Sequence, residues 1–183
     1  PERIGDILDW AERLGYDALN VTHPCKQLVL PYLDRVEPLA AALGAVNTVL
    51  FTPEGRIGHN TDTTGYAESF RTDLAGAAHD RVIQMGAGGA GSAVADALLR
   101  EGVRALSIVD LNVFRAGSLA ADLRVRHPQA HIESAALEQL PSLIAGADGG
   151  TGGPADGPAN GIVHCTPMGM AERPGVAFDP ALL

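Results

Sequence analysis

Positive charge is scarce in this sequence. Its 183 residues contain 13 lysine and arginine side chains against 22 aspartates and glutamates, which gives a formal net charge of −9. So acidic a chain argues against binding to a nucleic-acid backbone, because that binding depends on clustered cations. Apolar residues make up 46% of the chain, which is enough for a core. No apolar run approaches the roughly 20 residues that a membrane span needs, so we expect no membrane partner.

Cysteines and metal-ligand patterns are equally sparse. The two cysteines, Cys25 and Cys165, are too far apart for a CxxC metal site and too few for a disulfide framework. The six histidines are scattered without the spacing of metal ligands, so we expect no metal. Unpaired thiols favour a reducing, cytoplasmic setting.

Lysine is the rarest charged residue. Lys26, inside "LNVTHPCKQLVLPYLD" (19–34), is the only one, and every other cationic side chain is an arginine. Arginine stays protonated at any working pH, whereas lysine can release and regain a proton. This contrast predicts a chemical role for Lys26. A compositional bias toward arginine is the alternative explanation.

Turn residues and hydrophobic spacing divide the first part of the chain, residues 1–76, into short elements. The expected elements are a helix over 2–14 that stops at Gly15, a strand at 18–21, a helix from Pro24 to about Leu33, a helix at 36–43 ended by Gly44, strands at 45–51 and 56–60 joined by a tight turn, and a helix over 61–74 with Thr and Asp caps. This part is therefore of mixed α/β type.

Strands and helices alternate in the second part, residues 77–183. The expected elements are a buried strand in "RVIQMG" (81–86), a helix opened by a glycine-rich turn, a strand at 105–110, a helix over 111–126, a loop over 145–161, a strand at 162–165 and a turn in "TPMGM" (166–170). This order predicts a doubly wound parallel sheet with right-handed crossovers. The fold class is therefore α/β throughout.

The segment "GAGGAG" (86–91) matches the pattern G-x-G-x-x-G between a strand and a helix. In that context Gly86 permits the tight turn, Gly88 lets the backbone approach a pyrophosphate, and Gly91 allows close packing of helix on strand. The N–H groups of the helix N-terminus then face the phosphates. The pattern predicts a Rossmann-type dinucleotide site, and a glycine-rich connection without a ligand is the alternative.

Asp110 ends the next strand, where a carboxylate can accept hydrogen bonds from the adenosine ribose hydroxyls. A carboxylate there repels a 2′-phosphate, so the sequence favours NAD over NADP. Two alternatives stay open. Asp110 could merely cap the following helix, and Arg115 could either meet a 2′-phosphate or stack on adenine.

Three further motifs carry a resemblance to a known family. "NVTHPCK" (20–26), "GAVNT" (44–48) and "GHNTD" (58–62) resemble signature segments of the shikimate/quinate dehydrogenase family, and "TPMGM" resembles its loop near the nicotinamide. The cysteine before the lysine, together with Asp110, resembles the actinobacterial NAD-dependent quinate/shikimate branch. The family's substrate-carboxylate hydroxyls and its C-terminal glutamine-bearing helix have no counterpart here, so we expect a segment incomplete at both ends.

The resemblance implies roles for individual residues. Lys26 and Asp62 are the implied catalytic pair, and Thr22 and Asn47 join them in holding the substrate. Asp62 or Thr22 could instead cap a helix, and Asn47 could be a turn residue. The implied cofactor contacts are Gly86, Ala87, Gly88, Gly89, Ala90, Gly91, Asp110, Leu111, Asn112, Arg115, Cys165, Thr166, Pro167 and Met168. His164 and Cys165 stand where the family usually has Asn-Ala.

The implied activity is reversible hydride transfer between NAD and the C3 alcohol of shikimate or quinate, with the 3-dehydro acids as the ketone forms. NADP is the alternative cofactor, as in the shikimate dehydrogenase of aromatic amino-acid biosynthesis. A non-catalytic quinate- or shikimate-binding sensor and a plain dinucleotide-binding redox sensor are alternatives from other classes. A small molecule is the expected partner, and the resemblance also allows a homodimer.

Overall fold

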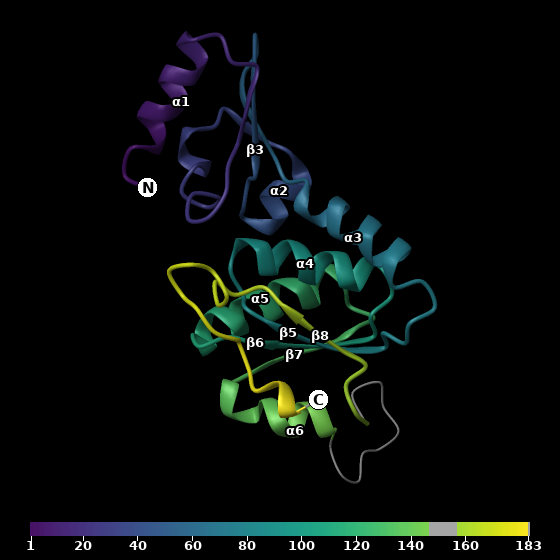
Figure 1. Ribbon diagram of the computed structural model, residues 1–183. Coiled ribbons are helices and arrows are strands. Elements are labelled where there is room, and N and C mark those ends of the chain that lie inside the picture. Colours follow the sequence, from purple (N-terminus) through teal and green to yellow (C-terminus); the bar gives the residue numbers. More distant parts are fainter. Residues whose placement is uncertain (147–156, 183) are drawn as a thin grey trace. The chain divides into compact units, whose positions relative to one another are not determined.

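The chain forms two compact units in this computed structural model, which describes residues 1–146 and 157–182 (Figure 1). The units are Pro1–Gly65 and Tyr66–Leu183. The division falls inside helix α3 (Asp62–Asp73), before the expected boundary after residue 76. Its physical reason is that Tyr66 and Phe70, on α3, pack against the core of the second unit.

The first unit contains a four-stranded mixed sheet in the order β1-β3-β4-β2. Its strands are β1 (Ala18–Asn20), β2 (Arg35–Val36), β3 (Thr48–Thr52) and β4 (Gly55–His59). Strand β3 is antiparallel to both β1 and β4, whereas β2 runs parallel to β4. The helices are α1 (Ile4–Arg13), the 3₁₀ turn η1 (Leu30–Tyr32), α2 (Pro38–Leu43) and the start of α3.

Helical spacing in α1 explains how this unit closes its core. Ile4, Leu8 and Ala11 are buried on one face of α1, as expected from the apolar period. Ile4 and Leu8 pack with Val29 and Val49 in one apolar cluster. Helix α2 ends at Gly44, whose φ of +61° lies in the left-handed region that glycine tolerates. The expected helices at 2–14 and 36–43 are thus confirmed.

The expected helix from Pro24 to Leu33 is wrong. The segment forms successive turns that end in η1. Two features work against a helix. The Lys26 carbonyl accepts from Val46 N–H at 2.8 Å instead of bonding along the chain. Pro31 has no N–H to donate to the preceding turn.

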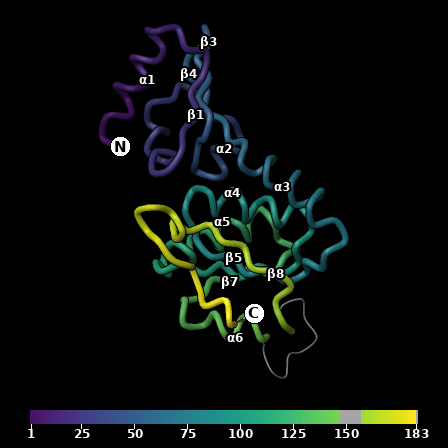
Figure 2. The backbone as a smooth tube through the Cα atoms, viewed as in Figure 1, coloured from purple at the N-terminus to yellow at the C-terminus, as the bar shows by residue number. Residues whose placement is uncertain are grey.

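The second unit is built on a parallel sheet in the order β7-β6-β5-β8. Its strands are β5 (Arg81–Met85), β6 (Ala105–Val109), β7 (His131–Ala135) and β8 (Gly161–His164). Figure 2 shows β5 and β8 side by side although they are far apart in sequence. Helices α4 (Gly89–Arg100) and α5 (Val113–Arg126) cover one face, and α6 (Leu140–Ala145) lies on the other (Figure 1).

Apolar strands buried on both faces explain this layering. All five residues of β5 and of β6 are buried, as in parallel sheets covered by helices on both sides. One cluster joins Leu106 and Ile108 to α4 and α5, and another joins Ile83 and Val109 to Leu140 of α6. The predicted doubly wound α/β arrangement is confirmed. Strand β7, η2 (Leu137–Gln139), α6 and the C-terminal turn η3 (Pro180–Leu182) had not been expected.

A buried carboxylate links α4 to the end of α5. The Asp96 side chain has no exposed surface and accepts hydrogen bonds from Arg100 Nε at 2.6 Å and from Arg126. His127 Nε2 lies 2.9 Å from Asp96 Oδ1. Burial opposes ionisation of Asp96, but the bonds from His127 and Arg100 and the nearby arginine charges outweigh it. The pKa of Asp96 therefore lies below its usual value.

The described residues contain neither a helix suited to a bilayer nor a cluster of metal-ligating side chains. None of their helices is both long and apolar enough to cross a bilayer. Within the same residues, no group of three or more His, Cys, Asp or Glu side chains is placed to hold a metal ion. The expected loop at 145–161 falls mostly outside the described residues.

Candidate active site

One edge of the first sheet brings the three motifs of the first unit together. Asn20 of β1 pairs with Thr48 of β3, which pairs with His59 of β4. Because β3 is antiparallel to both neighbours, the ends of β1 and β4 and the beginning of β3 share this edge. The segments 20–26, 44–48 and 58–62 therefore converge there, although they are separate in sequence.

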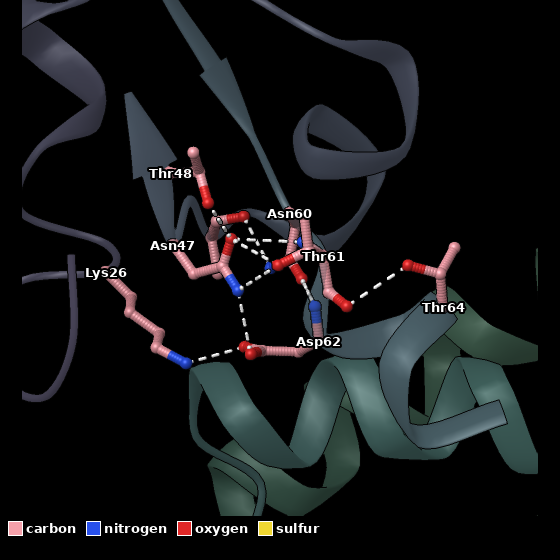
Figure 3. A network of polar contacts seen from close by, with 8 residues as sticks. Lys26, Asn47, Thr48, Asn60, Thr61, Asp62 and Thr64 are labelled. Carbon is pink, nitrogen blue, oxygen red and sulfur yellow. Dashed lines mark hydrogen bonds and ion pairs between the residues drawn. The ribbon is translucent and has the colours of Figure 1, made fainter. Parts of the chain in front are cut away.

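Lys26 and Asp62 meet at this edge. Lys26 Nζ lies 2.6 Å from Asp62 Oδ2, a charge-assisted contact of short length (Figure 3). The two side chains keep 17% and 27% of their surface exposed, so the pair is sheltered but open to a small molecule. The bond from Val46 N–H to the Lys26 carbonyl fixes the backbone from which the lysine extends.

Asn47 holds the carboxylate of the pair. Its Nδ2 group donates to Asp62 Oδ1 at 2.8 Å and to Thr61 Oγ1 at 3.0 Å (Figure 3). Its Oδ1 accepts from Thr61 N–H at 3.0 Å and from Thr48 Oγ1 at 2.9 Å. Asn47 is only 5% exposed, and its amide hydrogens are both engaged. Asp62 is therefore held from two sides, by an ammonium and by an amide.

Asn60 is a functional residue that sequence reasoning missed. It is 7% exposed, its Nδ2 donates to the Ala45 carbonyl at 2.9 Å, and its Oδ1 accepts from Asp62 N–H at 3.0 Å. The second bond satisfies a free donor at the start of α3 and orients the residue that bears the carboxylate. An asparagine just before a helix start is the signal that could have identified it.

Thr22 lies at the same turn as Lys26. Its side chain is exposed, and its carbonyl accepts from Cys25 N–H at 2.7 Å. The alternative role of Thr22, capping a helix at Pro24, is wrong because that helix does not form. Asp62, by contrast, is the first residue of α3, and its carboxylate bonds Lys26 and Asn47.

The glycine-rich turn of the second unit shows three different reasons for its glycines. Gly86 has a φ of +102°, and a Cβ there would lie 2.8 Å from the Cys165 backbone. A Cβ on Gly91 would lie 2.2 Å from the Gly86 carbonyl oxygen. A Cβ on Gly88 would meet no described atom within 4 Å. Gly86 and Gly91 are thus required by the fold, whereas the room above Gly88 is free for a ligand.

The start of α4 presents backbone N–H donors that suit a phosphate. Helix α4 begins at Gly89 with Gly88 as its N-cap, and within the described residues no side chain caps it. Its first-turn N–H groups can therefore bind an anion. This glycine-rich turn, residues 86–91, fits a dinucleotide pyrophosphate by its space and by its donors.

Asp110 already uses both carboxylate oxygens. Oδ2 accepts from Ala87 N–H and Oδ1 from Asn112 N–H, each at 2.8 Å. Asn112 in turn caps α5 by accepting from Arg115 N–H at 3.2 Å. Asp110 thus acts as a strand-end cap, and each carboxylate oxygen still has a lone pair for a ribose hydroxyl. Leu111 next to it is 86% exposed.

The loop after β8 lies against the glycine-rich turn. Cys165 N–H donates to the Met85 carbonyl at 2.7 Å, and Met168 N–H donates to Thr166 Oγ1 at 3.2 Å. His164 Nε2 lies 2.5 Å from the same hydroxyl. Burial raises the pKa of the Cys165 thiol to about 12, which favours its protonated form at neutral pH. Pro167 lies between Thr166 and Met168 in the sequence, and the bond from Met168 N–H to the Thr166 hydroxyl spans it.

The strand order of the second sheet explains why the end of β5 suits a ligand. Chain succession runs from β5 outward through β6 to β7, and the next strand, β8, returns to the opposite side of β5. In doubly wound sheets, ligands bind beyond the carboxyl ends of the strands at such a reversal of order. The turn at 86–91 follows β5 and the loop at 165–168 follows β8, so both flank this position.

Comparisons with known proteins identify a group of related sequences. The family described as the shikimate dehydrogenase substrate-binding domain matches residues 1–49. The shikimate dehydrogenase (NADP(+)) of Pseudarthrobacter chlorophenolicus is 47% identical over 182 residues, which cover 100% of this chain and 58% of that protein. The quinate/shikimate dehydrogenase (NAD(+)) of Corynebacterium efficiens is 42% identical over 181 residues, covering 98% of this chain and 60% of that protein.

Solved structures point to the same group of proteins. Quinate dehydrogenase from Corynebacterium glutamicum in complex with NAD matches with a TM-score of 0.80 and 41% identity. The match covers 98% of this chain and 60% of that one. The chain thus spans about three fifths of the length of the relatives it matches, with 58% to 60% covered in these cases.

Proposed function

The chain belongs to the shikimate/quinate dehydrogenase family, and on that premise we propose that the protein transfers hydride reversibly between NAD and the C3 alcohol of shikimate or quinate. The observation that carries the proposal is the contact of Lys26 with Asp62 at 2.6 Å, braced by Asn47. A sensor that only binds these acids needs hydrogen-bonding groups, but it does not need an ammonium held against a carboxylate.

Lys26 handles the proton in this proposal. Oxidation of the alcohol removes the C3 hydrogen with its electron pair as hydride, and the hydroxyl hydrogen leaves as a proton. Lys26 Nζ takes up that proton as the neutral amine, and in the reverse direction the resulting ammonium returns the proton to the carbonyl oxygen. Its ammonium also stabilises negative charge that develops on this oxygen. A guanidinium would supply the charge but would hardly release a proton.

Asp62 and Asn47 position the lysine and the substrate. The Asp62 carboxylate holds the ammonium in place, and the Asn47 amide holds the carboxylate. Thr22, exposed at the same turn, is placed to offer its hydroxyl to a ring hydroxyl of the substrate. The polyhydroxylated ring of shikimate or quinate suits a site made of such donors and acceptors.

The second unit would hold the dinucleotide. The N–H groups at the start of α4 and the open space above Gly88 support binding of the pyrophosphate, and Asp110 supports binding of the ribose. The residues 165–168 complete the implied contacts on the nicotinamide side. When bound, the nicotinamide supplies or accepts the hydride.

An NADP-dependent shikimate dehydrogenase is the second candidate function. Arg115 is exposed in the first turn of α5, shortly after Asp110, where a guanidinium could reach a 2′-phosphate. Some relatives carry NADP in their names and others carry NAD. We favour NAD because the Asp110 carboxylate would meet a 2′-phosphate with like charge.

Steady-state kinetics of the full-length protein test the proposal. Shikimate and quinate are each assayed with NAD and with NADP, and the four kcat/KM values are compared. We expect oxidation of at least one acid with a preference for NAD. Dinucleotide binding without turnover of either acid would favour the sensor and contradict the proposal. A cytoplasmic location and a homodimer belong to the same proposal, and sedimentation of the full-length protein tests the dimer.

A further inference from the structure

A glutamine occupies the middle of the second sheet, where an apolar residue would be ordinary. Gln84 has no exposed surface and lies in β5, paired with Ile108 of β6 and Val163 of β8. Its strand neighbours Ile83 and Met85 are buried apolar residues. Burying an amide costs free energy unless hydrogen bonds compensate it. The hydride-transfer chemistry assigns no role to this residue.

The Gln84 amide binds both ends of the glycine-rich turn. Nε2 donates to the Gly86 carbonyl and to the Gly91 carbonyl, each at 2.9 Å. Only the NH₂ end of the amide can donate to two carbonyl oxygens, so the oxygen end must face the other way. That Oε1 has no hydrogen-bond partner within residues 1–146 and 157–182. The position keeps a buried oxygen unpaired in order to hold the turn.

Hydrogen bonds also fix the orientation of the Gly86–Ala87 peptide plane. In a trans peptide the C=O and the following N–H point in opposite directions. The Gly86 C=O is held by Gln84, and the Ala87 N–H of the same peptide donates to Asp110 at 2.8 Å. This first peptide of the turn is therefore held at both ends, by Gln84 of β5 and by Asp110, which directly follows the adjacent strand β6.

We propose that Gln84 is a positioning residue of the dinucleotide site. By bonding the Gly86 carbonyl, it keeps this acceptor oxygen away from the ligand side and leaves N–H groups to face the pyrophosphate, and its bond to the Gly91 carbonyl ties the first turn of α4 to the sheet. The two ends lie close together, since a Cβ added at Gly91 would lie 2.2 Å from the Gly86 oxygen, and this closeness lets one amide bond both carbonyls. This inference rests on the proposed function, because it assumes that the turn binds a dinucleotide.

The test compares ligands with and without a pyrophosphate. Gln84→Met keeps the side-chain length and removes the donor, and Gln84→Asn keeps an amide but is one methylene too short. Calorimetric titration of the full-length protein gives Kd for NAD, ADP-ribose and adenosine. For both variants we expect NAD and ADP-ribose to bind about tenfold more weakly, as for a lost pair of hydrogen bonds. Adenosine should change less than twofold, and kcat at saturating NAD should change little.

Ser107→Ala is the matched control. Ser107 is 3% exposed in the adjacent strand β6, and its hydroxyl bonds Glu133 at 2.6 Å instead of the turn. Ser107→Ala should leave Kd for NAD, ADP-ribose and adenosine unchanged. Equal weakening of NAD and adenosine in a folded Gln84 variant, or unchanged NAD binding, would overturn the inference. Wild-type protein that fails to bind NAD would refute the proposed function itself.

Discussion

Replacing Gly88 and Gly91 by alanine, one at a time, separates what the turn does for the fold from what it does for a ligand. At Gly91 the added Cβ would lie 2.2 Å from the oxygen and 2.9 Å from the carbon of the Gly86 carbonyl. These are backbone atoms, so no rotamer change relieves the clash. At Gly88 the Cβ would meet no described atom within 4 Å, and the φ of −81° suits alanine.

The two substitutions should therefore affect stability differently. In Gly91→Ala, overpacking should lower the free energy of unfolding by about 1–3 kcal/mol. The better helix propensity of alanine should offset up to about 1 kcal/mol of this loss. For Gly88→Ala, the weaker N-cap preference of alanine and the smaller entropy of the unfolded chain oppose each other. Each amounts to several tenths of a kcal/mol, so stability should stay within about 0.5 kcal/mol of wild type. Both variants should bind NAD about tenfold or more weakly.

Urea unfolding and calorimetric titration with NAD, both on the full-length protein, measure the two effects. Gly117→Ala, inside helix α5, is the control. Its Cβ would meet only Ser134 Oγ of β7 among the described atoms, at 3.8 Å, so the substitution should stabilise the protein without changing its affinity for NAD. Unchanged NAD affinity in Gly88→Ala would show that no phosphate lies above this residue. Wild-type stability in Gly91→Ala would refute the close approach of the helix to the turn.

Three further predictions concern charged side chains. Lys26→Ala should lower kcat by about 10²-fold or more with a smaller change in substrate KM, the usual scale of positioned proton transfer; near-normal kcat would contradict a catalytic lysine. Asp110→Asn should shift the ratio of kcat/KM for NAD to that for NADP toward NADP, and adding Leu111→Arg should shift it further; an unmoved ratio would leave Asp110 as a cap alone. Asp96→Asn should lower the free energy of unfolding by about 3 kcal/mol at neutral pH. Because the pKa of Asp96 is lowered in the folded state, its contribution is complete above the unfolded value of about 3.9 and declines below it, so the difference from the variant in urea unfolding should narrow in acid.

Local signals in the sequence were sufficient for most of the elements. Helix ends at Gly15 and Gly44, and the strand–turn–helix pattern around residues 81–100, depend on neighbours in the chain. Strand β7 escaped prediction because its sequence, "HIESA", has only two apolar residues and lacks strict alternation, and because it lies at the sheet edge. Its strand character comes from pairing with β6, which lies outside any local window.

The residues that support the candidate site were harder to predict than those that we propose to act in it. Lys26 stood out by its rarity and Asp62 by its motif. Asn60 and Gln84 are ordinary polar letters in the sequence, and only the fold shows that each bonds two backbone groups. Their partners lie on other segments or across a turn, so spacing alone could not indicate them.

The missing helix at residues 24–33 is part of how the Lys26–Asp62 pair forms. In a helix the Lys26 carbonyl would bond four residues along the chain, and the lysine would point wherever the helical rotation placed it. In the structure that carbonyl bonds Val46, the residue just before Asn47. The backbone of the lysine is thereby tied to the segment that holds the Asp62 carboxylate, so the ammonium and its partner are positioned by one sheet edge. An irregular turn at Lys26 gives a more direct coupling between the two charges than the expected helix could.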